Sequence, residues 1–451
     1  MVNDKRLFLG SCFALITTAF SFSIRAGILS KLGEQYGFSG EQLGTINSMW
    51  FLGFPLSMII GGLIYNSVGG KIIMQFAFFA HAVGILLTIF SGGSYMILLI
   101  STLLIGLANG CTEAACNPMI ADAYQGNKMN EMLNKFHVWF PGGIVLGSII
   151  SYIMTYFSLG WEAQIWVILV PAIIYAYLFW GQSFPTPKQK TASGSSGNNV
   201  LGLVTAIIGI ALFAINLFPN LVSGMNVNLN YILITAVICL IVSTYSYYGA
   251  LFAFMFACMS LTAISEFGPQ SWVGLILSKS GANPMLLLAI TTLTMAVARF
   301  FAGPIIQKIS TTGILLISAV LACIGLFLLS RVTGYAAYAS AIVYACGIAY
   351  FWPNMVGFVA ERIPSSGAMG MSVIGGIGMF SSSIFQPIIG RWIDSAKQTQ
   401  TNAGLTGDAM ELAAGQSTLA TMVTFPVILI VAFTILYFWQ KNIKPTGVAS
   451  H

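Results

Sequence analysis

Residues 312–330 read TGILLISAVLACIGLFLLS and contain no charged side chain. A helix needs about 20 apolar residues to cross the hydrocarbon layer of a bilayer, so this stretch is predicted to be a transmembrane helix. Similar runs recur along the 451 residues, of which 57% are hydrophobic and 7% are charged, and the mean hydropathy is +0.86. Soluble globular proteins contain roughly 25% charged residues. The composition therefore predicts an all-α protein that crosses the membrane many times.

Apolar runs divide the chain into three parts. Six runs come first, at about 7–30, 42–65, 71–92, 94–119, 136–157 and 163–182. Residues 182–199, QSFPTPKQKTASGSSGNN, have the composition of a flexible linker. Two shorter runs follow at about 201–218 and 230–246, and six more at about 249–271, 284–306, 312–331, 335–359, 366–390 and 419–440. We therefore expect an N-terminal six-helix bundle (1–182), a cytoplasmic linker (183–200), an extra transmembrane hairpin (201–247) and a C-terminal six-helix bundle (248–451).

The charges predict the orientation. With both termini in the cytoplasm, eleven Lys and Arg residues lie on the cytoplasmic side and five outside, as the positive-inside rule requires. We expect a multi-pass protein of the cytoplasmic (inner) membrane whose first apolar run is retained, since no small-residue cleavage site follows it. The net charge of +6 is scattered over short loops, which argues against nucleic-acid binding. The seven cysteines lie in apolar runs, so neither disulfides nor a metal site is expected.

The two halves of the chain carry matching features in the same order. Ile28–Lys31 (ILSK) ends the first run, and Ile276–Lys279 (ILSK) follows the first run after the hairpin. Paired glycines open the fifth and the eleventh of the twelve bundle spans, at 142–143 and 375–376. This order suggests a parallel repeat of six spans. Residues 62–71, GLIYNSVGGK, resemble the loop between the second and third helices of the major facilitator superfamily, although Asn66 and Ser67 replace its usual acidic residue and arginine.

Three further stretches resemble the fucose:proton symporter family, which includes glucose and galactose permeases. They are EAACNP at 113–118, LNKFHVWFPGG at 133–143 and SEFGPQSW at 265–272. The resemblance implies two six-helix bundles that work by alternating access, with Glu113 taking part in substrate binding and proton coupling. It also implies a polar role for His137, because family members often have a polar residue at this position. The family's first span often carries an acidic residue where this chain has Ile24 and Arg25.

Ionisable residues inside the spans are candidates for function. Such groups cost roughly 2.5 to 3.5 kcal/mol at the bilayer centre and occur mainly in bundle interiors or water-filled cavities. Glu113 has Asn117 one helical turn later on the same face, and Glu266 precedes a Gly-Pro interruption of its helix. Both are predicted substrate and proton-coupling residues, with structural roles as the alternatives. Glu266, for example, would then pair with Arg25 or Arg299.

Arg25 has two possible roles. It can compensate a buried glutamate, or it can bind an anionic group of the substrate through its planar guanidinium. The first role is slightly favoured, because partner glutamates exist. Arg299 lies close to the cytoplasmic end of its span and is expected to snorkel or brace a gate. His81 has no polar companion in the sequence and is expected to be an ordinary interior residue.

A carbohydrate site needs an apolar ring face together with amide, hydroxyl or carboxyl groups. Amides and tryptophans at suitable positions extend the list of substrate-binding candidates, with ordinary packing or membrane anchoring as the alternative for each: Asn47, Trp50, Gln270, Trp272, Trp352, Asn354 and Gln386. His137, with an imidazole that exchanges protons near neutral pH, is a further candidate beside Trp139.

Together these features predict a secondary active transporter that uses no cofactor and is not an enzyme. The expected activity is uptake of a small polar solute, foremost a monosaccharide, in symport with H+, although Na+ suits the same carboxylates. The protein is expected to be a monomer in the lipid bilayer. An alternative is transport of an organic anion or acidic sugar through Arg25, and a less favoured alternative is a membrane receptor that does not transport.

Overall fold

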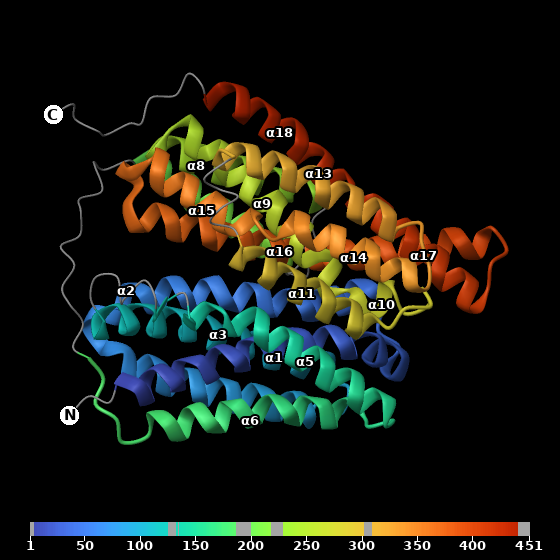
Figure 1. The fold of residues 1–451 in the computed structure, drawn as a ribbon, viewed down its shortest axis with the longest axis horizontal. Coiled ribbons are helices and arrows are strands. Elements are labelled where there is room, and N and C mark those ends of the chain that lie inside the picture. Colours follow the sequence, from blue (N-terminus) through green and yellow to red (C-terminus); the bar gives the residue numbers. More distant parts are fainter. Residues whose placement is uncertain are drawn as a thin grey trace.

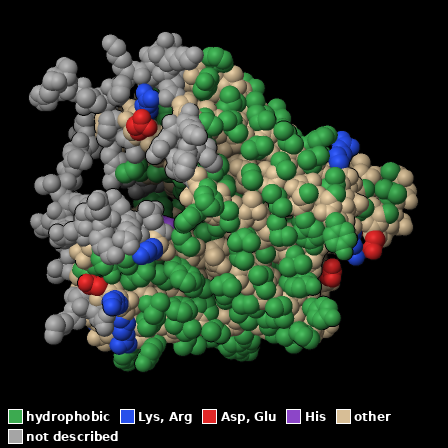
Figure 2. Space-filling view, viewed as in Figure 1, with side chains coloured by type: hydrophobic (Ala, Val, Ile, Leu, Met, Phe, Trp, Pro, Cys, Tyr) green, Lys and Arg blue, Asp and Glu red, His purple; other side chains and the backbone are tan. Residues whose placement is uncertain are grey.

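The computed structural model describes residues 4–124, 132–133, 135–185, 200–217, 229–301 and 309–440. Their regular structure is helical throughout, and eleven of their helices are long and apolar enough to cross a membrane. Figure 2 shows hydrophobic side chains across the middle of one face, with the charged side chains at its two ends. This distribution fits a protein surrounded by hydrocarbon, so the predicted all-α polytopic membrane class is confirmed.

The first bundle contains the six spans expected in the N-terminal half. Its helices are α1 (Asp4–Tyr36), α2 (Gly40–Ile89), α3 (Tyr95–Ala123), α5 (Trp139–Tyr156) and α6 (Trp161–Phe179). The long α2 supplies two spans, because Gly69 breaks the helix with φ 77° and ψ 159°. Only glycine adopts this backbone conformation without strain. The glycine turn predicted at 62–71 therefore reverses the chain between the second and third spans.

The second bundle follows a break in the described chain and a helix pair. Its helices are α9 (Ala250–Ser271), α10 (Val273–Ile276), α11 (Pro284–Phe300), α13 (Thr311–Leu329), α14 (Tyr335–Ile348), α15 (Phe351–Arg362), the 3-10 turn η2 (Pro364–Ser366), α16 (Gly367–Asn402), α17 (Gly407–Met422) and α18 (Thr424–Gln440). Figure 1 shows the two bundles one above the other, with the start of α1 and the end of α18 on the same side. We call that side the terminal end and the other the distal end.

Two helices that lie between the bundles in the sequence correspond to the predicted hairpin. They are α7 (Val200–Leu217) and α8 (Leu229–Tyr248), which pack against each other and, through α8, against α9. Phe213 and Ala236 join a buried cluster with Met49 of α2 and Ile384 of α16. The rings of Phe213 and Phe380 are 5.8 Å apart between centroids. The helix pair therefore touches both bundles along the seam between α2 and α16.

Candidate functional site

Arg25 is buried at the interface between the bundles without an ion-pair partner among the described residues. Its side chain is surrounded by aromatic rings, and its guanidinium carbon lies 4.8 Å from the ring centre of Trp50, 5.8 Å from that of Phe51 and 6.0 Å from that of Phe22. Its Nε and Nη1 atoms are inaccessible to solvent and have no hydrogen-bond partner in the described part of the chain. Ring faces attract a cation, but they leave the directional N–H donors of the guanidinium unused.

The aromatic rings around Arg25 continue into the second bundle. Phe267 of α9 lies 6.1 Å from Phe22 and 5.7 Å from Phe51, and it also contacts Trp352 at 6.2 Å between ring centroids. The backbone of Ala26 packs directly against Gly274 in α10. Arg25 therefore lies where the two bundles meet, as a substrate site of an alternating-access carrier requires.

Of the two arginines considered as partners of Glu266, Arg299 is the one that pairs with it. The two side chains lie 3.5 Å apart, Glu266 is buried, and Arg299 also donates to the backbone oxygen of Ala349 at 2.8 Å. Tyr344 donates to the backbone oxygens of Ser265 and Glu266 at 2.6 and 3.1 Å and so braces the segment before Pro269. The charges of Glu266 and Arg299 compensate each other, so Arg25 is not needed to balance Glu266.

Glu113 bonds to the neighbour that the sequence placed on its face. The amide nitrogen of Asn117 donates to its carboxylate at 2.5 Å, while Oδ1 of Asn117 is buried with no partner among the described residues. Glu113 itself is only partly buried. Gly106 of the same helix packs on the backbone of Trp50, and seven residues of helix rise about 10 Å. Glu113 is thus about two turns along α3 from the level of the Arg25 site.

Three of the predicted sugar-binding residues meet at one oxygen. Asn47 Nδ2 of α2 and Trp272 Nε1 both donate to Oε1 of Gln386 in α16, each at 2.7 Å. Oδ1 of Asn47 is buried and has no hydrogen-bond partner within the described ranges. Since Asn47 precedes Trp50 and Phe51 by three and four residues, it lies on the same face of α2 as the rings around Arg25. An acceptor without a donor thus lies about one turn of α2 from two of the rings around Arg25.

The remaining predicted residues lie apart from this centre. Gln270 Nε2 contacts the sulfur of Met295 at 3.7 Å, and Asn354 donates to the backbone oxygen of Tyr350 at 2.8 Å. The ring of Trp352 contacts that of Phe267, which in turn contacts the rings around Arg25. His137 is exposed, and its ring packs against that of Phe136 at 5.0 Å between centroids. These contacts satisfy Asn354 within its own helix and place His137 outside the central cluster.

The expectation that His81 lacks polar companions is wrong. His81 is fully buried, its Nδ1 lies 2.9 Å from the hydroxyl of Tyr175, and its Nε2 lies 2.8 Å from Oδ1 of Asn109. Both partners belong to other spans, 94 and 28 residues away in the sequence. Only the packing of the helices brings them together, so no local sequence pattern signals the contact.

The bundles are closed against each other at the distal end. The carboxylate of Asp394 in α16 accepts from the backbone N–H groups of Gly40 and Glu41 at 2.8 and 3.0 Å, which caps the first turn of α2. Arg391 pairs with Glu41 at 2.8 Å, and the backbones of Gly40 and Gly390 touch where any side chain would collide. We call this set of contacts the distal gate.

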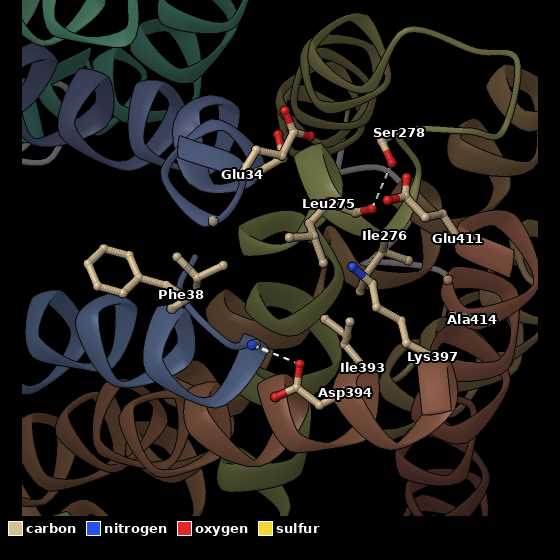
Figure 3. A pocket seen from close by; sticks show the side chains of 15 residues that line it. Glu34, Phe38, Leu275, Ile276, Ser278, Ile393, Asp394, Lys397, Glu411 and Ala414 are labelled. Atoms are coloured by element: carbon tan, nitrogen blue, oxygen red, sulfur yellow. Dashed lines mark hydrogen bonds between the residues drawn. The ribbon is translucent and has the colours of Figure 1, made fainter. Parts of the chain in front are cut away.

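A small cavity of about 160 Å³ adjoins the distal gate. Figure 3 shows Glu34 and Phe38 entering it from one bundle and Asp394, Lys397 and Glu411 from the other. At the same end, Lys279 pairs with Asp408 at 2.9 Å, and this hydrogen bond raises the pKa of Lys279 above its usual value. Arg25 is not among the residues that line this cavity.

Comparison with known proteins identifies the family of this chain. Residues 11–278 match the sequence family described as the Major Facilitator Superfamily. Among curated relatives, the hexuronate transporter of Bacillus subtilis (strain 168) is 24% identical over 34% of this chain and 36% of its own length. The sphingosine-1-phosphate transporter SPNS2 of Danio rerio is 26% identical over 28% of this chain and 26% of its own length. The chain thus covers about a quarter to a third of these two relatives.

Solved structures of transporters share the whole fold. A nucleoside transporter, NupG, is 14% identical with a TM-score of 0.69, covering 96% of this chain and 100% of its own. An auto-inhibited peptide transporter of the POT family is 11% identical with a TM-score of 0.71, covering 99% of each chain. At these identities the likeness concerns the fold alone. It confirms the predicted arrangement of two helical bundles.

Proposed function

The chain belongs to the Major Facilitator Superfamily, and we propose that it is a secondary transporter of a small hydroxylated carboxylate, such as an acidic sugar. The observation that carries this proposal is the buried guanidinium of Arg25, whose Nε and Nη1 atoms lack partners among the described residues. A guanidinium gives a carboxylate two parallel hydrogen bonds, one from Nη2 and the other from Nε or Nη1, so either of these two atoms can supply one of them. Buried charges are normally paired, so an anionic substrate supplies the missing partner.

Hydroxyl recognition follows from the amide cluster. Asn47 offers an unused acceptor, Oδ1, about one turn of α2 before Trp50 and Phe51, two of the rings around Arg25. A substrate hydroxyl can donate to this oxygen. Two relatives are named as carriers of anions, the hexuronate transporter of Bacillus subtilis and a probable chloroplastic anion transporter of Arabidopsis thaliana, which supports an anionic solute. The resemblance to the fucose:proton symporter family supports a sugar skeleton.

Glu113 is proposed as the proton-coupling residue. It is partly buried, it bonds only to a neutral amide among the described residues, and it lies about two turns of α3 from the Arg25 site. Glu266 is less suited to this role than the sequence suggested, because its side chain already pairs with that of Arg299. We propose symport with H+ through Glu113, in the cytoplasmic membrane and with both termini in the cytoplasm.

A neutral monosaccharide is the second candidate. The contact of Asn47, Trp272 and Gln386 favours it, since amides beside a ring face suit sugar hydroxyls. In this case Arg25 would be held by the rings alone. The two candidates differ in one chemical group of the substrate, which makes them separable by a matched pair of ligands.

The test uses galacturonate and galactose, which differ only at carbon 6. A ligand that binds the folded protein stabilises it by mass action, by about 2.7 kcal/mol at a concentration a hundredfold above Kd. The melting temperature rises accordingly. We expect galacturonate, but not galactose, to stabilise the purified protein, and Arg25→Lys to remove this effect. Stabilisation by galactose to the same degree would favour the neutral sugar. Uptake of labelled galacturonate into proteoliposomes then separates a carrier from a receptor.

A further inference from the structure

A continuous chain of hydrogen bonds crosses the first bundle and ends beneath Arg25. It starts at Tyr175 in α6 and passes through His81 in α2 to Asn109 in α3. The amide nitrogen of Asn109 donates to Oγ of Ser21 in α1 at 3.1 Å, and the indole N–H of Trp50 donates to the same oxygen at 2.9 Å. All five side chains are buried. We call these residues the polar chain.

The directions of these hydrogen bonds are fixed by one another. Oγ of Ser21 accepts from two N–H groups and donates to the backbone oxygen of Thr18 at 2.7 Å. Asn109 therefore turns its nitrogen to Ser21 and its oxygen to His81. An amide oxygen only accepts, so His81 carries a proton on Nε2, and its Nδ1, in the neutral ring, accepts from the hydroxyl of Tyr175. Each member thus has a defined orientation.

Trp50 is the member that touches the candidate site. Its ring lies 4.8 Å from the guanidinium carbon of Arg25 and packs against Phe22 and Phe51 at 5.6 and 5.0 Å between centroids. Apolar packing alone gives the indole N–H no partner, and a buried N–H without one is costly. The hydrogen bond to Ser21 selects one orientation, since only that one directs Nε1 at the hydroxyl.

We infer that Ser21, Asn109 and His81 are positioning residues that fix the Trp50 ring beneath Arg25 and thereby keep the guanidinium directed into the bundle interface. The inference rests on the proposed role of Arg25 in binding an anion. The guanidinium of Arg25 packs against aromatic rings and has no ion pair among the described residues, so the rings determine where it sits. A substitution at His81, three hydrogen bonds away from Trp50, should therefore disturb the site without touching it.

The first experiment needs no substrate. The protein has nine tryptophans, and ¹⁵N-labelling of their indoles gives a spectrum in which the Trp50 signal is identified by its loss in Trp50→Phe. We expect Ser21→Ala and His81→Leu to shift the Trp50 signal. His81→Gln, whose amide can both donate and accept, should return it toward the wild-type position. If His81→Leu does not fold, Asn109→Leu, which removes the amide between His81 and Ser21, takes its place.

Ser101→Ala is the matched control. Ser101 is as buried as Ser21 and accepts a hydrogen bond from Thr88 at 2.9 Å in the same bundle, but it is not part of the polar chain. We expect it to leave the Trp50 signal in place. The inference is overturned if Ser21→Ala and the His81→Leu or Asn109→Leu variant leave that signal unchanged, or if Ser101→Ala moves it as far as they do.

The second experiment measures galacturonate binding by titration. Ser21→Ala should raise Kd about five- to tenfold, the scale of a buried hydrogen bond, while Ser101→Ala should not. In the Trp50→Phe background, which lacks the indole N–H, Ser21→Ala should cause no further loss. An equal loss in both backgrounds would overturn the positioning role. If the unmutated protein binds no galacturonate, the proposed function fails, and the indole spectra still decide whether the polar chain fixes Trp50.

Discussion

The guanidinium carbon of Arg25 lies 4.8 Å from the ring centre of Trp50, and Arg25 has no carboxylate partner among the described residues. In the second bundle, Glu266 and Arg299 compensate each other. The slight preference for Arg25 as a balancing charge therefore finds no support in the structure. The alternative role, anion binding, becomes the stronger one, because it supplies the hydrogen-bond acceptors that the buried guanidinium lacks.

Substitution of Arg25 should separate charge from geometry. A lysine keeps the charge but cannot make two parallel hydrogen bonds to a carboxylate. Since a hydrogen bond to a charged group contributes about 1.5 to 3 kcal/mol, we expect Arg25→Lys to weaken galacturonate binding about tenfold to a hundredfold. Calorimetric titration measures this loss. Galacturonate affinity that stays the same in Arg25→Lys and Arg25→Ala would remove Arg25 from the site.

Neutralising Glu113 should uncouple transport from the proton gradient. Glu113→Gln keeps the shape of the side chain, including an oxygen for the amide of Asn117, but it cannot titrate. We expect exchange of labelled for unlabelled substrate across proteoliposomes to persist, while accumulation driven by a pH gradient is lost. Wild-type accumulation in this variant would exclude Glu113 as the coupling residue.

The pair of Glu266 and Arg299 should be structural. Breaking a buried ion pair costs 3 to 5 kcal/mol when both groups are fully buried, but the side chain of Arg299 is 31% exposed, so we expect Glu266→Gln to lose about 1 to 2 kcal/mol. The double variant Glu266→Gln/Arg299→Gln should regain part of this loss, because no charge is left unpaired. Melting temperatures measure both effects. A double variant less stable than the sum of both single losses would contradict a compensating pair.

Weakening the distal gate should favour the state that opens at that end. Asn at position 394 can accept only one of the two N–H groups at the start of α2, because its other terminal atom is a donor. We expect Asp394→Asn to speed the reaction of a cysteine at Leu43, which is buried beside the gate, with an impermeant thiol reagent in a background without native cysteines. Ser101→Ala serves as the control. An unchanged rate would mean that the contacts of Asp394 do not hold the gate.

The helix pair α7 and α8 should influence the motion between the bundles. Phe213 packs on Phe380 of α16 in a cluster that includes Met49 of α2. Removing residues 201–246 exposes this seam, so we expect a changed transport rate with substrate affinity retained, measured by initial uptake and by titration. An unchanged rate would mean that the helix pair, which lies outside both six-span repeats, is dispensable for transport.

Much of the fold could be predicted from the sequence, because lipid imposes long apolar runs whose ends are visible as charged and glycine-rich breaks. The turn at Gly69 is an example, since a positive φ is required there. Asn47, Trp272 and Gln386 could also be named, because amides and indoles stand out in apolar helices. Their meeting at a single oxygen could not, since that depends on how α2 and α16 pack.

The partners of ionisable residues were the least predictable part. Glu266 had two arginines available, and only the tertiary structure selects Arg299. His81 appeared isolated, although Tyr175 and Asn109 reach it from two other spans. In each case the sequence gives the chemical groups but not which helix faces meet, and the pairing is a property of the packed bundle.

The lone charge of Arg25 also has an electrical consequence. When a carrier exposes a cation first to one aqueous phase and then to the other, the cation moves through the transmembrane potential. The energy of this movement is about 2.3 kcal/mol per charge for each 100 mV. With the site empty, an inside-negative voltage pulls Arg25 toward the cytoplasm, and an ionised Glu113 that moves with it would cancel this force. A bound monoanion together with a proton on Glu113 would leave the loaded carrier with the same net charge, zero. Uptake of the anion with one proton would therefore be electrically neutral, and the voltage would hold neither the loaded nor the empty carrier.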